Sequence, residues 1–313
     1  MFYIIRRILL LVITVALVSV ITFSVFQILP GDPVRTMLGT EADETQIESL
    51  RNELGLNRPL HEQYVDWIRG IFTGDLGNSI RFSMPVSVLL MERLPVTLSV
   101  AGMALFIVVL FALPLGIFAA KRQKKFSDVV LSSVTQLGMA IPSFWLGMII
   151  ILYIGMNVDF FKINGYIPWS ESIKGALSTL ILPALTIAIP QIAVKFRYVR
   201  TSILDQMQLD YVRTIRSKGL PERIVVYKHI LKNALIPILT IFGLITAEVV
   251  AGTIIVEQVF ALPGIGQLLI TSISYRDFPL VQGIVMYITI TVVFINFVVD
   301  ILYSVIDPRI RLR

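Results

Sequence analysis

Six long apolar runs in this chain leave few folds open to it. The runs cover residues 8–29, 94–118, 129–155, 177–194, 234–256 and 281–305. Only two of their side chains, Glu248 and Asp300, carry a formal charge. A helix needs about 20 apolar residues to cross the hydrocarbon core of a bilayer, because its backbone amides must find their partners within the segment. The runs therefore predict an all-α integral membrane protein with six transmembrane helices.

The overall composition favours the same class. Of the 313 residues, 56% are hydrophobic and 15% are charged, whereas soluble domains carry about 25% charged residues. So little charge cannot coat a water-exposed globule. The absence of cysteine excludes disulfides, thiolate metal sites and cysteine nucleophiles, and a chain with only His61 and His229 lacks the residues for histidine-rich metal chemistry.

The distribution of basic residues predicts the orientation. If the N-terminus is cytoplasmic, the cytoplasmic segments hold 18 Lys and Arg and the external segments hold 9. The contrast becomes 18 to 3 when the long external segment 30–93 is left out, because long loops translocate largely regardless of charge. Both termini are therefore expected in the cytoplasm. The basic residues then act as topological anchors, and the net charge of +6 does not indicate nucleic acid.

Three parts follow from these runs. Residues 1–29 form an N-terminal anchor helix, since the apolar run is too long for a cleaved signal peptide and ends in Pro-Gly-Asp-Pro. Residues 30–93 form a small external segment with short amphipathic stretches. Residues 94–313 form a five-helix core, in which a turn and a short apolar helix over 268–273 dip back towards the membrane.

The cytoplasmic segment 195–233, between the fourth and fifth runs, carries unusual punctuation. Asp210 is expected to cap a short helix over 211–218, which Gly219 ends in a left-handed conformation. Pro221 and Glu222 then suit the start of a second helix that leads to the fifth run. A solvated charged connector would also explain the composition. A solvated connector does not need residues that end one helix and start another. The glycine and proline of this segment do both, which favours a docking element.

Few residues inside the runs suggest chemistry. Glu248 lies about two-thirds along the fifth run, where an ionisable side chain is a functional candidate. A packing role beside Thr246 and Thr253 is the alternative. Pro142 interrupts the third run, and Pro183, Pro190 and Pro237 interrupt others, so each of these helices can kink. The chain has no Gly-x-x-x-x-Gly-Lys-Ser/Thr loop, no His-Glu-x-x-His and no Gly-x-Ser-x-Gly, so none of these catalytic constellations is present.

Several motifs are similar to those of one family. The run from Asp210 to Pro221, DYVRTIRSKGLP, resembles the cytoplasmic coupling loop of ABC importer permeases of the dipeptide, oligopeptide and nickel family. In that family a Glu-Ala-Ala triplet stands six residues before the glycine. Here the triplet positions hold Arg213, Thr214 and Ile215, so the triplet has diverged while Gly219 is kept.

The resemblance covers the whole chain. Further motifs in matching order are Pro30-Gly31-Asp32-Pro33, Gly74-Asp75-Leu76-Gly77, Pro263-Gly264-Ile265-Gly266, Arg276-Asp277-Phe278-Pro279 and Asp307-Pro308-Arg309. Each is weak alone, but their order and spacing resemble the first of the family's two permease subunits.

The resemblance implies a transport subunit rather than an enzyme. It would form half of a translocation path in the bacterial cytoplasmic membrane. Its partners would be a second homologous permease, two ATPase subunits and an external substrate-binding protein. It implies no cofactor on this chain, with ATP and Mg bound by the ATPases.

The family also suggests which residues act. Those expected to couple the chain to an ATPase are Asp210, Tyr211, Arg213, Thr214, Ile215, Lys218, Gly219, Leu220 and Pro221. Candidates for the translocation path are Glu248, Pro142 and Asn296, and no metal site is expected.

The sequence leaves alternatives open for the cargo and for the class of transporter. Short peptides are the first expectation, and nickel or a metal–chelator complex is the second. An ion-coupled secondary transporter is the rival of another class. Such a carrier would be expected to show inverted repeats or several intramembrane charges, and neither is visible in the sequence.

Overall fold

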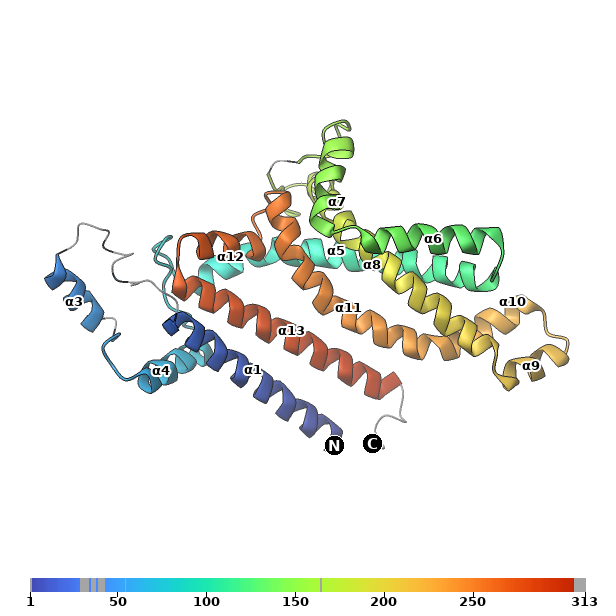
Figure 1. Ribbon diagram of the computed structural model, residues 1–313, viewed down its shortest axis with the longest axis horizontal. Helices are drawn as coiled ribbons and strands as arrows, with labels where there is room; N and C mark the ends of the chain where they lie inside the picture. Colours follow the sequence, from blue (N-terminus) through green and yellow to red (C-terminus); the bar gives the residue numbers. More distant parts are fainter. Residues whose placement is uncertain are drawn as a thin grey trace. The chain divides into compact units, whose positions relative to one another are not determined.

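The protein is mainly helical in the part described by the computed structural model, which covers residues 2–28, 43–53, 55–163 and 165–306 together with positions 34 and 38. Figure 1 shows the course of the chain. In order, the elements are α1 (Phe2–Ile28), α3 (Glu44–Glu53), α4 (Leu60–Thr73), α5 (Val86–Lys121), α6 (Phe126–Ala140), α7 (Ser143–Ile150), the π-helical η1 (Ile151–Gly155), α8 (Ile173–Met207), α9 (Asp210–Ser217), α10 (Glu222–Ile224), the π-helical η2 (Val225–Ile230), α11 (Leu231–Val259), α12 (Ile265–Ser274) and α13 (Phe278–Ile306).

The predicted membrane helices are present, with one departure. Five described helices are long and apolar enough to cross a membrane, namely α1, α5, α8, α11 and α13. The predicted third span, 129–155, is instead two helical pieces, α6 and α7–η1, bent by 101°. Counting that pair as one broken span makes six.

Proline chemistry explains the break. Ile141, the residue before Pro142, is extended (φ −86°, ψ 121°), and Pro142 is the N-cap of α7 (φ −61°, ψ 136°). A residue before proline is disfavoured in the α region, so α6 ends there. Pro142 therefore divides the predicted span rather than kinking a continuous helix. Pro183 and Pro190, by contrast, lie inside the continuous helix α8.

The described residues fall into two compact units, one within Met1–Thr97 and Pro263–Phe294 and the other within Leu98–Leu262 and Ile295–Arg313. In the first unit, α4 packs on α1 through aromatic side chains. The Phe23 ring meets Tyr64 edge-on at 5.4 Å and lies 5.9 Å from Trp67, while Ser19 Oγ and the Tyr64 hydroxyl share a 2.7 Å hydrogen bond. Helix α4, in the segment predicted to be external, is thus held to the first helix.

The apolar core of the first unit joins α5, α12 and α13. Its buried side chains are Val86, Leu89, Leu90, Ile265, Leu268, Leu280 and Ile284. The buried Thr97 hydroxyl accepts a 2.9 Å hydrogen bond from the N–H of Ile265, at the start of α12. A Cβ on Gly283 would come within 2.6 Å of Val86 Cγ1, so α13 and α5 approach closely there. The predicted short apolar helix is present as α12.

A buried carboxylate organises the loop before α5. Asp277 is fully buried and caps α13 by accepting from the N–H of Leu280 at 3.3 Å. It also accepts hydrogen bonds from the Ser79 hydroxyl and from the N–H groups of Ile80 (3.2 Å) and Arg81 (3.1 Å). One side chain thus ties together segments almost 200 residues apart in sequence.

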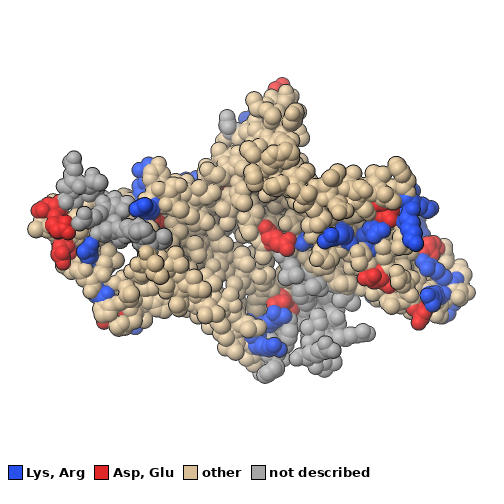
Figure 2. Space-filling view, in the orientation of Figure 1, with Lys and Arg blue, Asp and Glu red and all other residues tan. Residues whose placement is uncertain are grey.

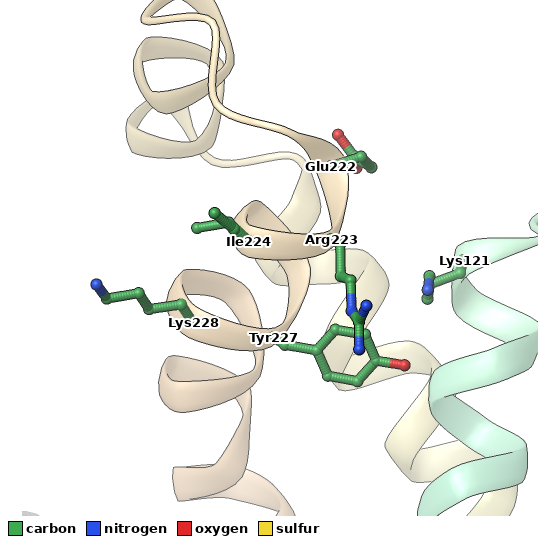
Figure 3. A pocket seen from close by; sticks show the side chains of 6 residues that line it. All are labelled: Lys121, Glu222, Arg223, Ile224, Tyr227 and Lys228. Atoms are coloured by element: carbon green, nitrogen blue, oxygen red, sulfur yellow. The ribbon is translucent and has the colours of Figure 1, made fainter.

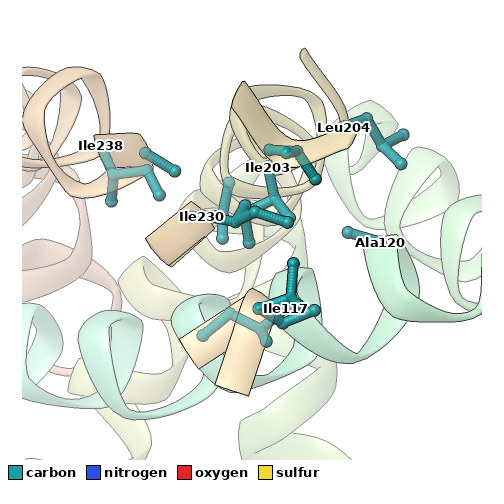
Figure 4. Packing of buried hydrophobic residues seen from close by; sticks show 11 residues of the cluster. Ile117, Ala120, Ile203, Leu204, Ile230 and Ile238 are labelled. Atoms are coloured by element: carbon teal, nitrogen blue, oxygen red, sulfur yellow. The ribbon is translucent and has the colours of Figure 1, made fainter. Parts of the chain in front are cut away.

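The second unit is built around α8. The cluster of buried side chains there comprises Ile117, Ala120, Val199, Ile203, Leu204, Val212, Val225, Val226, Ile230, Ala234 and Ile238 (Figure 4). It joins α5, α8, η2 and α11 and includes Val212 of α9. The predicted fourth span, 177–194, lies within α8, which begins at Ile173 and continues to Met207 as a packed helix.

We predict that Asp277→Ala destabilises the protein. The change leaves the buried donors of Ser79, Ile80 and Leu280 without an acceptor, and each such donor costs about 1–3 kcal/mol. The midpoint of thermal unfolding of the purified protein in detergent should fall clearly. Asp66→Ala is the matched control. It removes only exposed pairs with Arg58 and Arg69 and should change stability by less than about 1 kcal/mol. Equal midpoints for the two variants would contradict this role for Asp277.

Candidate functional site

The loop between α8 and α11 folds as the sequence predicts, apart from its first cap. Helix α9 begins at Asp210, and its N-cap is Leu209, which is extended (φ −73°, ψ 148°) and makes no side-chain capping bond. Asp210 as the cap was therefore wrong: the residue lies one position further on, in the first turn. Its carboxylate is 3.4 Å from Arg213 Nη1, and an acidic side chain there still favours the helix dipole.

Helix α9 has two different faces. Val212 is fully buried in the cluster around α8, and Tyr211 and Ile215 pack against the same cluster. The remaining coupling candidates are exposed, namely Asp210, Arg213, Thr214, Lys218, Gly219, Leu220 and Pro221. The predicted set is thus divided into an inner side that anchors α9 and an outer polar side that is free to meet another molecule.

The turn after α9 has a defined geometry. Lys218 is the C-cap, and Gly219 has a φ of +78°, the left-handed conformation expected of it. Pro221 precedes α10 as its N-cap, with Glu222 in the first turn. Across the turn, Arg216 donates to both carboxylate oxygens of Glu222, at 2.7 and 3.1 Å. This hydrogen bonding raises the pKa of Arg216 above its usual value.

Glu248 has an ionic partner that the sequence analysis placed elsewhere. Lys195 Nζ lies 3.1 Å from Glu248 Oε2, with the Lys195 side chain 4% exposed and that of Glu248 53% exposed. Thr253, considered as a companion of Glu248, instead donates to the carbonyl of Val250. The sequence analysis counted Lys195 with the segment 195–233, whereas the structure places it within α8, facing Glu248. The helical spacing of Ala193, Phe196 and Val199 could have shown that the apolar face continues.

The other two path candidates lie on different elements. Pro142 stands at the break between α6 and α7, and Asn296 is on α13. The Oδ1 atom of Asn296 is buried without a hydrogen-bond partner among the described residues, as is Oε1 of Gln191 on α8. Buried amide oxygens of this kind are costly inside a folded chain.

A second ion pair lies where α6 meets α8, and the sequence analysis did not find it. Arg200 donates to both oxygens of Asp128, from Nε at 2.6 Å and from Nη2 at 2.8 Å. Asp128 also accepts from the N–H of Lys124 at 3.0 Å. This fully bonded carboxylate holds α6 to α8.

Within the described part of the chain, no three His, Cys, Asp or Glu side chains form a cluster that could hold a metal ion.

Comparison with known proteins identifies the family. Residues 112–312 match the model of the binding-protein-dependent transport system inner membrane component, and residues 1–101 match the model of the N-terminal part of such membrane components. The chain therefore belongs to this family of transport permeases and is a multi-pass protein of the bacterial inner membrane.

Individual relatives cover nearly the whole chain. A Brucella abortus protein named as a peptide transport system permease is 40% identical over 94% of both chains. The oligopeptide transport system permease protein AppB of Bacillus subtilis is 36% identical, and the dipeptide transport system permease protein DppB of Lactococcus lactis is 35% identical, each over 99% of both chains.

We predict unequal effects from breaking the Lys195–Glu248 pair. Glu248→Gln leaves a buried ammonium without its counter-ion and should lower stability by about 2 kcal/mol or more, since removing one partner of a buried pair costs about 3–5 kcal/mol. Lys195→Met leaves a carboxylate that is half exposed and should cost less. The double variant should recover part of the loss. Thermal unfolding of all three variants in detergent measures the coupling, and equal costs for the two single variants would contradict the assignment.

Proposed function

We propose that this chain is one of two homologous permease subunits of an ATP-driven importer of short peptides. The observation that carries the coupling role is the construction of α9, which is anchored through Val212 and exposes a polar face. The peptide cargo is supported by the names of relatives that match nearly the whole chain.

In this proposal the energy comes from partner subunits. Two ATPases bind ATP and Mg, and an external binding protein delivers the peptide. An ATPase groove receives the outer face of α9, and the Arg216–Glu222 pair makes the turn stiff enough to transmit its displacement. ATP favours one conformation of the complex because it binds that conformation better.

The proposed orientation places both termini and α9 in the cytoplasm. Basic side chains gather around α9 and α10 in the second unit (Figure 2), as the excess of Lys and Arg on the cytoplasmic side requires. The second permease subunit and the external binding protein would then complete the path on the other side.

The Lys195–Glu248 pair belongs to the path in this proposal. A half-exposed carboxylate within an apolar helix is costly against lipid and normally faces a bundle interior or a water-filled cavity. The face of α11 that carries Glu248 is therefore assigned to the translocation path or to the second permease. Pro142 and Asn296 remain candidates for the same path.

The first experiment is purification with a C-terminal tag from native membranes in mild detergent, followed by mass spectrometry and by peptide uptake into vesicles. An ATPase with a Walker loop, a second permease and a binding protein should copurify, and uptake should require ATP. Uptake driven by an ion gradient after ATP depletion would favour a secondary transporter. If the copurified binding protein binds nickel or a chelate rather than peptide, the proposed peptide cargo is wrong and the metal is the cargo.

We predict that Gly219→Val uncouples the complex without preventing membrane insertion. Open space surrounds Gly219, so the added side chain meets no neighbour, but a β-branched residue is strained at a φ of +78°. Peptide-stimulated ATP hydrolysis and uptake should fall several-fold. Gly219→Asn is the control, because asparagine tolerates the left-handed region and should retain most activity. Normal uptake by the valine variant would contradict the coupling role of this turn.

A further inference from the structure

A pocket of about 690 Å³ lies between the end of α5 and the start of the α10–η2 segment. Its lining residues are Lys121, Glu222, Arg223, Ile224, Tyr227 and Lys228. Figure 3 shows Lys121 and Arg223 extending into the pocket from α5 and α10, with the Tyr227 ring beside them. Lys228 and Ile224 point away from that ring. The side chains that meet in the pocket are therefore two cations and a phenol.

The charges in this pocket are not balanced within the described part of the chain. Glu222, the acidic lining residue, already binds Arg216 through both carboxylate oxygens. Lys121 Nζ lies 4.9 Å from the centre of the Tyr227 ring, a cation–π contact that stabilises the ammonium without neutralising it. Arg223 forms none of the ion pairs found among the described residues. Two like charges thus converge on one pocket, which is unfavourable unless an anion lies between them.

We propose that this pocket binds the phosphate of an anionic phospholipid headgroup. A phosphate offers several acceptor oxygens, so it can accept from the Arg223 guanidinium and from the Lys121 ammonium at once. The Tyr227 hydroxyl adds a neutral donor from the pocket wall.

The surroundings favour a lipid over a free phosphate ion. Lys121 ends the candidate membrane span Val86–Lys121 and follows the apolar run 94–118 by three residues, so it is expected near the lipid headgroups. The apolar and aromatic lining residues are partly exposed, with Ile224 at 40% and Tyr227 at 49%. Phe126, shortly after the end of α5, is 85% exposed. Basic and aromatic side chains at a helix end are typical of the membrane interface, and basic pockets there bind anionic headgroups.

The site is separate from the outer face of α9, and it requires only membrane insertion, which the family establishes. It does not depend on the identity of the cargo. An occupied pocket would join α5 to α10 through the lipid and would steady the segment that follows the α9 turn.

The test compares lipid retention by three forms of the purified complex. The wild type, the double variant Lys121→Gln/Arg223→Gln and the control Lys232→Gln are exchanged into micelles with equal phosphatidylglycerol and phosphatidylcholine. They are then washed, and the bound lipid is quantified by mass spectrometry. Lys232 is exposed at the start of α11 and does not line the pocket. Parallel samples receive inorganic phosphate as a competitor.

The wild type and Lys232→Gln should retain phosphatidylglycerol in preference to phosphatidylcholine. The double variant should bind phosphatidylglycerol about 30-fold more weakly, since each basic side chain near an anionic surface contributes about 1 kcal/mol. Equal retention by the double variant would overturn the proposal. Equal retention of phosphatidylglycerol and phosphatidylcholine by the wild type, with or without inorganic phosphate, would overturn the lipid assignment. Loss of a copurifying ATPase with lipid retention unchanged would show that the two cations serve a protein contact instead.

Discussion

The structure depends on one constraint, that a backbone amide in hydrocarbon has no water to bond to. Helices meet this constraint within a single segment, and the apolar runs of the described chain accordingly fold as helices. Where proline removes a backbone hydrogen bond, the helix either continues or breaks. Pro183 and Pro190 are absorbed within α8, which packs against α6, α7 and α11. Pro142 ends one helix and begins another. The same residue type thus gives a continuous helix in one place and a bend of 101° in another.

Charges inside this apolar framework are paired or fully bonded. Asp128 is held by Arg200, and Asp277 by donors from a distant loop. Lys195 and Glu248 are also paired, but their pair differs from these, because the cation is buried while half of the anion side chain is exposed. An arrangement that satisfies one partner and leaves the other open suits a site that faces something outside this chain. This asymmetry is why the pair, rather than Asp128, is assigned to the path.

In the loop between α8 and α11, helix α9 is anchored by one face and exposes the other. One face of α9 contributes Val212 to the cluster around α8, so a load on the exposed face reaches the long helices through packed side chains. The Arg216–Glu222 pair and the left-handed Gly219 keep the turn in one conformation. Nearby, Lys121 at the end of α5 and Arg223 of α10 share a pocket. Within the described chain neither of these two cations has an ion-pair partner. These two cations without an ion-pair partner thus lie close to the helix that is proposed to contact the ATPase.

The sequence by itself determined the helical membrane class, the positions of five of the six predicted spans and the left-handed turn at Gly219. These follow from local properties: apolar length, the conformational freedom of glycine and the order of motifs. Only the tertiary structure decided that Lys195 lies inside the helical unit beside Glu248, because α8 is extended to Met207 by packing rather than by hydropathy. It also decided that Asp210 is a first-turn residue, that Tyr211 and Ile215 face inward, and that Asp277 organises the loop before α5. The inward packing of Tyr211 and Ile215, the Lys195–Glu248 pair and the bonds of Asp277 depend on contacts between residues far apart in the chain, which no local pattern specifies.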